Sequence, residues 1–185
     1  SYQGAESNLL WSMMRRLTGL QVPGAPAPAA SAPELAEQSL ARSFLISSDT
    51  AHAVHPNYAS IHEEHLRPKL NQGPVIKTNA KQRYASTAVT TFLLRRIAHR
   101  ANVPLQEFEV RNDCPCGSTI GPMLSKDAVA LALTQHVRTV DLGNPELSMH
   151  SIREMCGSKD VDYKIRLFTE FFRSFEQIDQ ELEVD

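Results

Sequence analysis

The sequence predicts an α/β protein, because segments typical of strands alternate along the chain with segments typical of helices. Short runs that can fill a buried strand occur at residues 44–46, 74–78, 108–110 and 139–143. Around them, apolar residues recur at helical spacing over residues 4–20, 86–99 and 160–175. The chain has 185 residues, which can bury one good core, so we expect one domain over residues 1–185.

The composition excludes several classes of protein. The apolar fraction of 42% and the charged fraction of 22% are ordinary for a globular domain. A net charge of -2 without a long basic run gives no support to nucleic-acid binding. The longest apolar run, residues 128–133, is far short of the ~18 residues that a membrane helix needs, so we expect no membrane partner. Three cysteines, an odd number, favour a reducing compartment, and we expect a cytoplasmic protein.

The first forty residues predict two helices joined by a loop. Residues 4–20 form an amphipathic pattern whose apolar stripe is expected to face the core: Leu9, Leu10, Met13, Met14, Leu17 and Leu20. Residues 22–33 are rich in Pro and Ala, which predicts a mobile surface loop. Pro33 then opens a short helix that ends near Ala41. The chain begins in mid-pattern and without Met, which indicates a piece of a longer chain.

The candidate site follows the first strand. Residues 44–46 run into Asp49, His52 and His55, and ligands in α/β folds collect beyond the carboxyl ends of strands. Carboxylate and neutral imidazole are both common zinc ligands. A metal or catalytic site is one interpretation, and a His-rich surface turn closed by Pro56 is the other. The nearby run at residues 61–65 is not a zinc-protease helix motif, because its second His would have to stand where Leu66 is. We therefore interpret this run as a solvated connection.

The middle and end of the chain predict further elements. Ser86 is expected to cap a helix that ends near His99, with an inner face formed by Val89, Phe92, Leu93 and Ile97. Cys114 and Cys116 lie in a glycine-punctuated loop over residues 114–122. Idle thiols are favoured there over a metal site, since no second cysteine pair exists. The closing helix is expected to present Ile165, Leu167, Phe168, Phe171, Phe172 and Phe175 to the core.

Six segments, taken in order, resemble the aspartyl aminopeptidases, a family of dinuclear zinc exopeptidases. They are SDTAHAVHPN at 48–57, GPVIK at 73–77, KQRYAS at 81–86, VRND at 110–113, PCGSTIGP at 115–122 and MHSIRE at 149–154. The resemblance implies the C-terminal part of a three-layer α/β/α catalytic domain. It also implies a dodecameric homo-oligomer that removes Asp or Glu from peptide N-termini with two zinc ions per complete active site.

The resemblance assigns roles to five residues. Asp49 would be a terminal ligand of one zinc and His150 a ligand of the other, both beside the substrate. His52, Lys77 and Tyr84 match positions that contact the substrate. The cation of Lys77 suits an acidic side chain, and the other two can donate hydrogen bonds to the substrate or to an oxyanion.

The sequence departs from the family in the absence of its β-rich dimerisation domain, in a longer Pro/Ala-rich loop at residues 22–33, and in two further features. Its first His ligand, bridging Asp and adjacent Glu pair, which includes the general base, would precede Ser1. Residues 126–136 also replace a shorter connection. The expected function is therefore an acid-specific zinc aminopeptidase, inactive as this chain alone. The alternative is a non-catalytic assembly or interaction module that keeps the fold.

Overall fold

The centre of the molecule is a mixed five-stranded sheet. The computed structural model describes residues 3–5, 7–20, 24, 30–130 and 137–182. The strands are β1 (Phe44–His52), β2 (Val75–Thr78), β3 (Gln106–Glu109), β4 (Arg138–Leu147) and β5 (Met155–Cys156). Their order is β1-β4-β2-β3, with β5 paired to β4. β1 runs parallel to β4 and β2 parallel to β3, whereas β2 and β4 are antiparallel. The predicted α/β class is confirmed.

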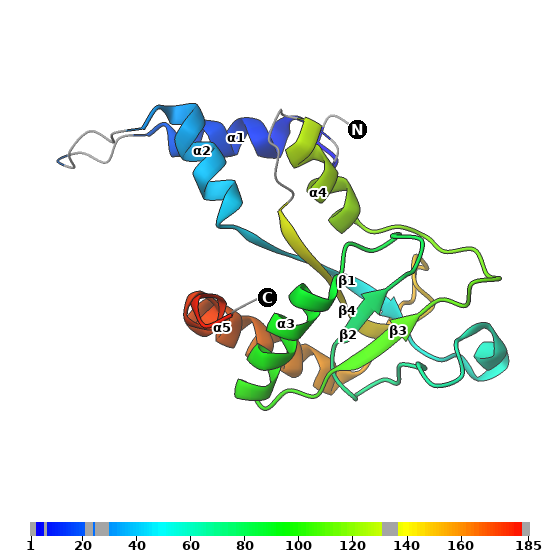
Figure 1. The fold of residues 1–185 in the computed structure, drawn as a ribbon. Coiled ribbons are helices and arrows are strands. Elements are labelled where there is room, and N and C mark those ends of the chain that lie inside the picture. The colour runs from blue at the N-terminus through cyan, green and yellow to red at the C-terminus, as the bar shows by residue number, and fades with distance from the viewer. Residues whose placement is uncertain (1–2, 6, 21–23, 25–29, 131–136, 183–185) are drawn as a thin grey trace.

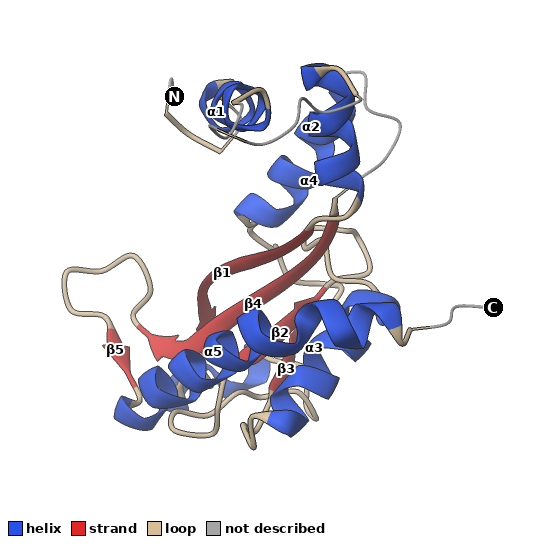
Figure 2. Cartoon of the chain, turned by 90° about the vertical axis from the view of Figure 1, so that its left-hand side faces the viewer, coloured by secondary structure: helices blue, strands red, loops and turns tan. Residues whose placement is uncertain are grey.

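Helices cover both faces of this sheet, as three layers require. α3 (Ala88–Arg100) and α5 (Ser158–Gln180) pack against each other on one face, and α4 (Ile120–Ala130) lies on the other, as Figure 2 shows. α1 (Leu9–Thr18) and α2 (Ala32–Ala41) pack together beyond the start of β1 (Figure 1). No helix in these described ranges is both long and apolar enough to cross a bilayer.

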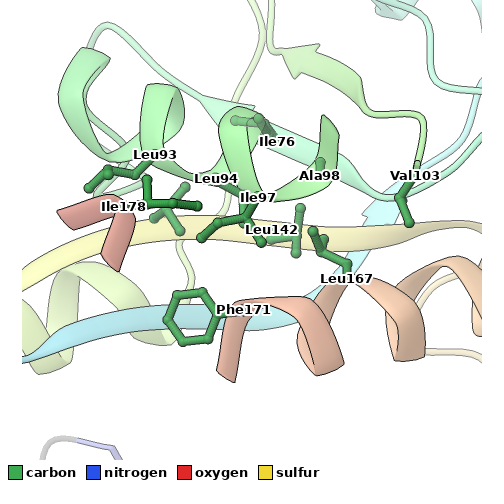
Figure 3. Close-up of a cluster of buried hydrophobic side chains, with 11 residues drawn as sticks. Ile76, Leu93, Leu94, Ile97, Ala98, Val103, Leu142, Leu167, Phe171 and Ile178 are labelled. Carbon is green, nitrogen blue, oxygen red and sulfur yellow. The ribbon is translucent and has the colours of Figure 1, made fainter. Parts of the chain in front are cut away.

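The main core lies between the sheet and the α3–α5 pair. Figure 3 shows its fully buried members, among them Ile76 of β2, Leu142 of β4, Leu93 and Ile97 of α3, and Leu167 of α5. These side chains come from strands and helices far apart in sequence. Burial of their apolar surface therefore fixes the helices on the sheet and, with them, the position of the strand ends.

The cap of α3 and the apolar faces of α3 and α5 differ from the predicted ones. The N-cap of α3 is Thr87, whose Oγ1 accepts a hydrogen bond from the N–H of Thr90. The predicted cap, Ser86, accepts instead from the N–H of Asp141. On α3 and α5 the predicted apolar faces were partly wrong, because Phe92, Ile165 and Phe172 are exposed. The true inner faces are rotated and include Leu94 and Ala98 of α3 and Ile178 of α5.

The prediction that the α1 stripe faces the core was wrong. Leu9, Leu10, Met13, Leu17 and Leu20 are all exposed. The helix is held instead by Trp11, which is buried in a small cluster with Val137 and is flanked by Leu40 and Leu45. The reason is that α1 lies beyond the start of β1 rather than over a face of the sheet. Among its residues, only Trp11 is buried against other described residues.

The strands near the site are longer than predicted, and β3 begins two residues earlier. β1 continues to His52 and β4 to Leu147, so Asp49 and His52 lie on a strand rather than after it. Most of the predicted loop at residues 22–33 lies outside the described residues, although α2 begins at Ala32. Of the segment at residues 126–136, which replaces a shorter connection in the family, residues 131–136 also lie outside the described residues, and residues 126–130 continue α4.

Gly143 allows β1 and β4 to approach each other beside the site. It pairs with Asp49, and a Cβ added there would lie 2.5 Å from the carbonyl carbon of Thr50. We expect Gly143→Ala to destabilise the fold by about 1–3 kcal/mol, with a Tm lower by several degrees in a thermal melt. Gly117→Ala is the control, because a Cβ there meets nothing within 4 Å. An unchanged Tm for Gly143→Ala would contradict this account.

Candidate active site

All five residues with predicted roles line one cavity of about 530 Å³. Asp49 and His52 are on β1, Lys77 is on β2, Tyr84 is in the loop that follows β2, and His150 follows β4. β1 and β4 are parallel, so their carboxyl ends meet at one edge of the sheet. That topology brings Asp49 and His150 to the same cavity although about a hundred residues separate them.

The ammonium of Lys77 is paired with the Oδ1 carboxylate oxygen of Asp49. Lys77 is only 4% exposed, whereas the side chain of Asp49 is 48% exposed. The ammonium also lies 5.6 Å from the ring centroid of Tyr84. Nζ of Lys164 in α5 also donates to the main-chain carbonyl of Asp49, at 3.1 Å. The cavity therefore holds a desolvated cation beside a carboxylate that still has an open side.

Tyr84 forms part of the cavity wall as a neutral phenol. Burial raises its pKa well above the usual range, and the hydrogen bond with Cys116 and the nearby charge of Asp49 act in the same direction. Cys116 Sγ lies 3.5 Å from the phenol oxygen. The hydroxyl therefore keeps its proton at neutral pH and can donate a hydrogen bond.

Two imidazoles flank Phe108 on the cavity wall. The rings of His52 and His62 lie 6.4 and 5.8 Å from the Phe108 ring. Burial lowers the pKa of His52, and the charge of Lys77 adds to the effect, while Glu146 opposes it. At neutral pH His52 is therefore uncharged and can both donate and accept a hydrogen bond.

Sequence reasoning missed two cavity residues with functional side chains. His62 belongs to the segment that failed the zinc-helix test, and no spacing rule places it here; its main chain forms an isolated bridge with Val110. Glu146 pairs with His52 across β1 and β4, and its Oε1 accepts from Thr50 Oγ1 at 2.8 Å. Only the strand register shows that this nearly buried carboxylate shares the cavity.

We expect His62 to titrate below the usual midpoint of about 6.5 for histidine. Burial is the largest cause that lowers the pKa of His62, and the charges of His52 and Arg67 lower it further. Because burial penalises the imidazolium, Phe108→Ala, which admits water, should raise the midpoint. NMR titration of the His62 ring protons measures both values. A midpoint at or above 6.5 in the unmodified protein would refute this account.

The cavity residues do not by themselves form a complete set of ligands for two zinc ions. The carboxylate of Asp49 and the imidazole of His150 are suitable donor types. The turn that carries His150 is fixed by its N–H, which donates to Glu154 Oε1 at 2.6 Å. Within the described ranges, however, no group of three or more His, Cys, Asp or Glu side chains could hold a metal ion. The donors present fit a part of a zinc site, and the rest would have to come from elsewhere.

Comparisons with known proteins now identify the family. The family model for aminopeptidase I zinc metalloproteases (M18) matches residues 1–172. Aspartyl aminopeptidase 1 of Schizosaccharomyces pombe is 47% identical over 185 residues, which is 100% of this chain and 36% of the relative. The chain thus spans about a third of the length of the curated relatives it matches.

Two solved structures support the same assignment. A cryo-EM structure of the Ape4 and Nbr1 complex matches with a TM-score of 0.86 and 47% identity, over 100% of this chain and 32% of that one. An S. cerevisiae mApe1 dodecamer matches with a TM-score of 0.77 and 28% identity, over 100% of this chain and 37% of that one. The resemblance seen in the sequence is confirmed, and the chain belongs to the aminopeptidase I zinc metalloprotease (M18) family.

Proposed function

We propose that this chain is part of an aminopeptidase that releases Asp or Glu from peptide N-termini, and that its cavity binds that first residue. The observation that carries the proposal is Lys77, a nearly buried lysine of the cavity lining whose ammonium contacts two other lining residues, Asp49 and Tyr84. Burying an unpaired cation costs free energy, and here the cation is paired with the carboxylate of Asp49. An acidic substrate side chain would supply a second anion to the same ammonium.

The other residues receive roles that fit their chemistry. Asp49, whose carboxylate has an open side, and His150 would each provide a ligand to one of two zinc ions beside the bound substrate. When bound, the zinc pair would polarise the scissile carbonyl and lower the pKa of a water molecule. Tyr84 and neutral His52 would donate hydrogen bonds to the substrate carbonyl as negative charge develops on its oxygen.

The proposal concerns the complete protein rather than this stretch alone. A general base and the further zinc ligands would come from elsewhere in the protein or from another subunit, since the described residues lack a full ligand set. A homo-oligomer fits this requirement, because the mApe1 relative is described as a dodecamer.

The test is an assay of the protein made from its complete coding sequence. We expect release of free Asp or Glu from short peptides, loss of release with a zinc chelator, and recovery when zinc is added back. Peptides with N-terminal Ala or Leu serve as the matched controls and should be poor substrates. Release that is insensitive to the chelator, or a preference for neutral residues, would overturn the proposal, and no release from any peptide would favour a non-catalytic assembly module.

A further inference from the structure

A fully buried carboxylate, Asp141 of β4, lies outside the cavity lining but contacts its supports. Its Oδ1 accepts from Ser47 Oγ at 2.6 Å and from Thr119 Oγ1 at 2.5 Å, and its Oδ2 accepts from the N–H of Ala85 at 2.6 Å. A buried carboxylate without donors would be costly, so these three hydrogen bonds are what allow it to stay inside. The donors come from three separate segments of the chain.

Two of those segments are walls of the cavity. Ala85 directly follows Tyr84, and Thr119 ends the cavity-lining stretch at residues 114–119. The main chain of Asp141 adds a fourth bond, since its N–H donates to Ser86 Oγ at 2.9 Å. Asp141 thus holds two loops at one point of the sheet, through both its side chain and its main chain: the loop after β2 and the loop before α4.

The two loops also contact each other above this point. Ser118 Oγ donates to the carbonyl of Arg83 at 3.1 Å, and Cys116 Sγ lies 3.5 Å from the hydroxyl of Tyr84. The start of α4 is close as well, because a Cβ added to Gly121 would lie 2.6 and 2.7 Å from the two oxygens of Asp141. The lack of a side chain at Gly121 lets the first turn of α4 close over the carboxylate.

We propose that Asp141 is a positioning residue that fixes both cavity walls and thereby the orientation of the Tyr84 hydroxyl. As a contribution to catalysis this inference rests on the proposed function, but the placement of the walls can be measured without any activity. Asparagine at position 141 has nearly the same shape and one acceptor oxygen fewer. If the NH₂ group of the asparagine points toward Ser47 and Thr119, their hydroxyls lose an acceptor. If it points toward Ala85, two N–H donors face and repel each other.

A second buried carboxylate provides a matched control. Asp160 of α5 is equally buried and accepts from the N–H groups of Asn71 and Gly73 at 2.7 and 2.9 Å. Those residues do not line the cavity. Asp160→Asn therefore carries the same chemical change and a similar loss of stability, at a place that holds no cavity wall.

The experiment measures alkylation of Cys116 by iodoacetamide, followed by peptide mass spectrometry, in the protein made from its complete coding sequence. Cys116 is half-buried on the wall that Asp141 holds. We expect Asp141→Asn to raise its alkylation rate at least fivefold and Asp160→Asn to leave it within twofold, while both lower the Tm. Equal rates in the two variants, or an unchanged rate in a folded Asp141→Asn protein, would overturn the inference.

A milder pair keeps the test decisive if Asp141→Asn does not fold. Thr119→Val removes only the hydroxyl from the loop, and Ser47→Ala removes only the hydroxyl from β1, although both donate to the same oxygen. Faster alkylation in Thr119→Val than in Ser47→Ala supports the inference, and the reverse order contradicts it. In active protein, kcat should fall with Thr119→Val while KM changes little. If the expected alkylation rates are found but the protein cleaves no peptide, the inference that Asp141 positions the two cavity walls stands. Only the proposed function is then refuted.

Discussion

Replacing Lys77 with alanine is expected to lower kcat/KM for peptides with N-terminal Asp or Glu by roughly a hundredfold or more. Lys77 is nearly buried in the cavity lining, so the attraction of its ammonium for a carboxylate is little screened by water. A neutral first residue makes no such pair, and its kcat/KM should change by no more than a few fold. Steady-state kinetics on a matched pair of peptides, with Asp or Asn as the first residue, measures the difference.

Two controls separate specificity from damage to the site. Lys81→Ala removes an exposed lysine four residues away and should leave both peptides unaffected. Zinc content must be measured in Lys77→Ala, because this variant also removes the ammonium that pairs with Asp49. An equal loss on both peptides would show that Lys77 is structural and would remove it from the specificity pocket.

The sequence pattern located the strands that carry the site but not their neighbours. Residues 44–46 and 139–143 were recognisable as strands, yet nothing in their composition shows that β1 and β4 are parallel and adjacent. That pairing, across more than ninety residues, is what places Asp49 and His150 at one cavity. Asp49 and His150 were predicted to share a site only from the family resemblance. Asp141 was predicted to lie on a strand, and no feature of the sequence indicated its positioning role, because its hydrogen-bond partners are 22 to 94 residues away.

Helix periodicity revealed apolar faces but not what covers them. On α5, Phe171 is buried against Phe44 and Phe175, while its neighbour Phe172 is exposed, a difference of one position that a broad aromatic stripe hides. On α1 the stripe was real but has no cover within the described residues. Amphipathicity shows that one side of a helix avoids water, and only the tertiary structure shows which surface it meets.

Asp49→Ala and His150→Ala are each expected to reduce bound zinc from two ions per site toward one or fewer, and to abolish peptide release. Each removes one proposed ligand, and a zinc ion needs three or four. Metal analysis of the protein made from its complete coding sequence gives the stoichiometry directly. His99→Ala, on the exposed end of α3, is the control and should retain both ions.

Stability distinguishes a lost ligand from a lost ion pair. Asp49→Ala also leaves the buried ammonium of Lys77 without its partner, so we expect an added loss of about 1–3 kcal/mol that exposed His150→Ala does not show. The double variant Asp49→Ala/Lys77→Met removes both charges and should recover that stability in a thermal melt. If Asp49 is a ligand, the double variant stays depleted of zinc; if its role is only to neutralise Lys77, zinc content returns with the stability.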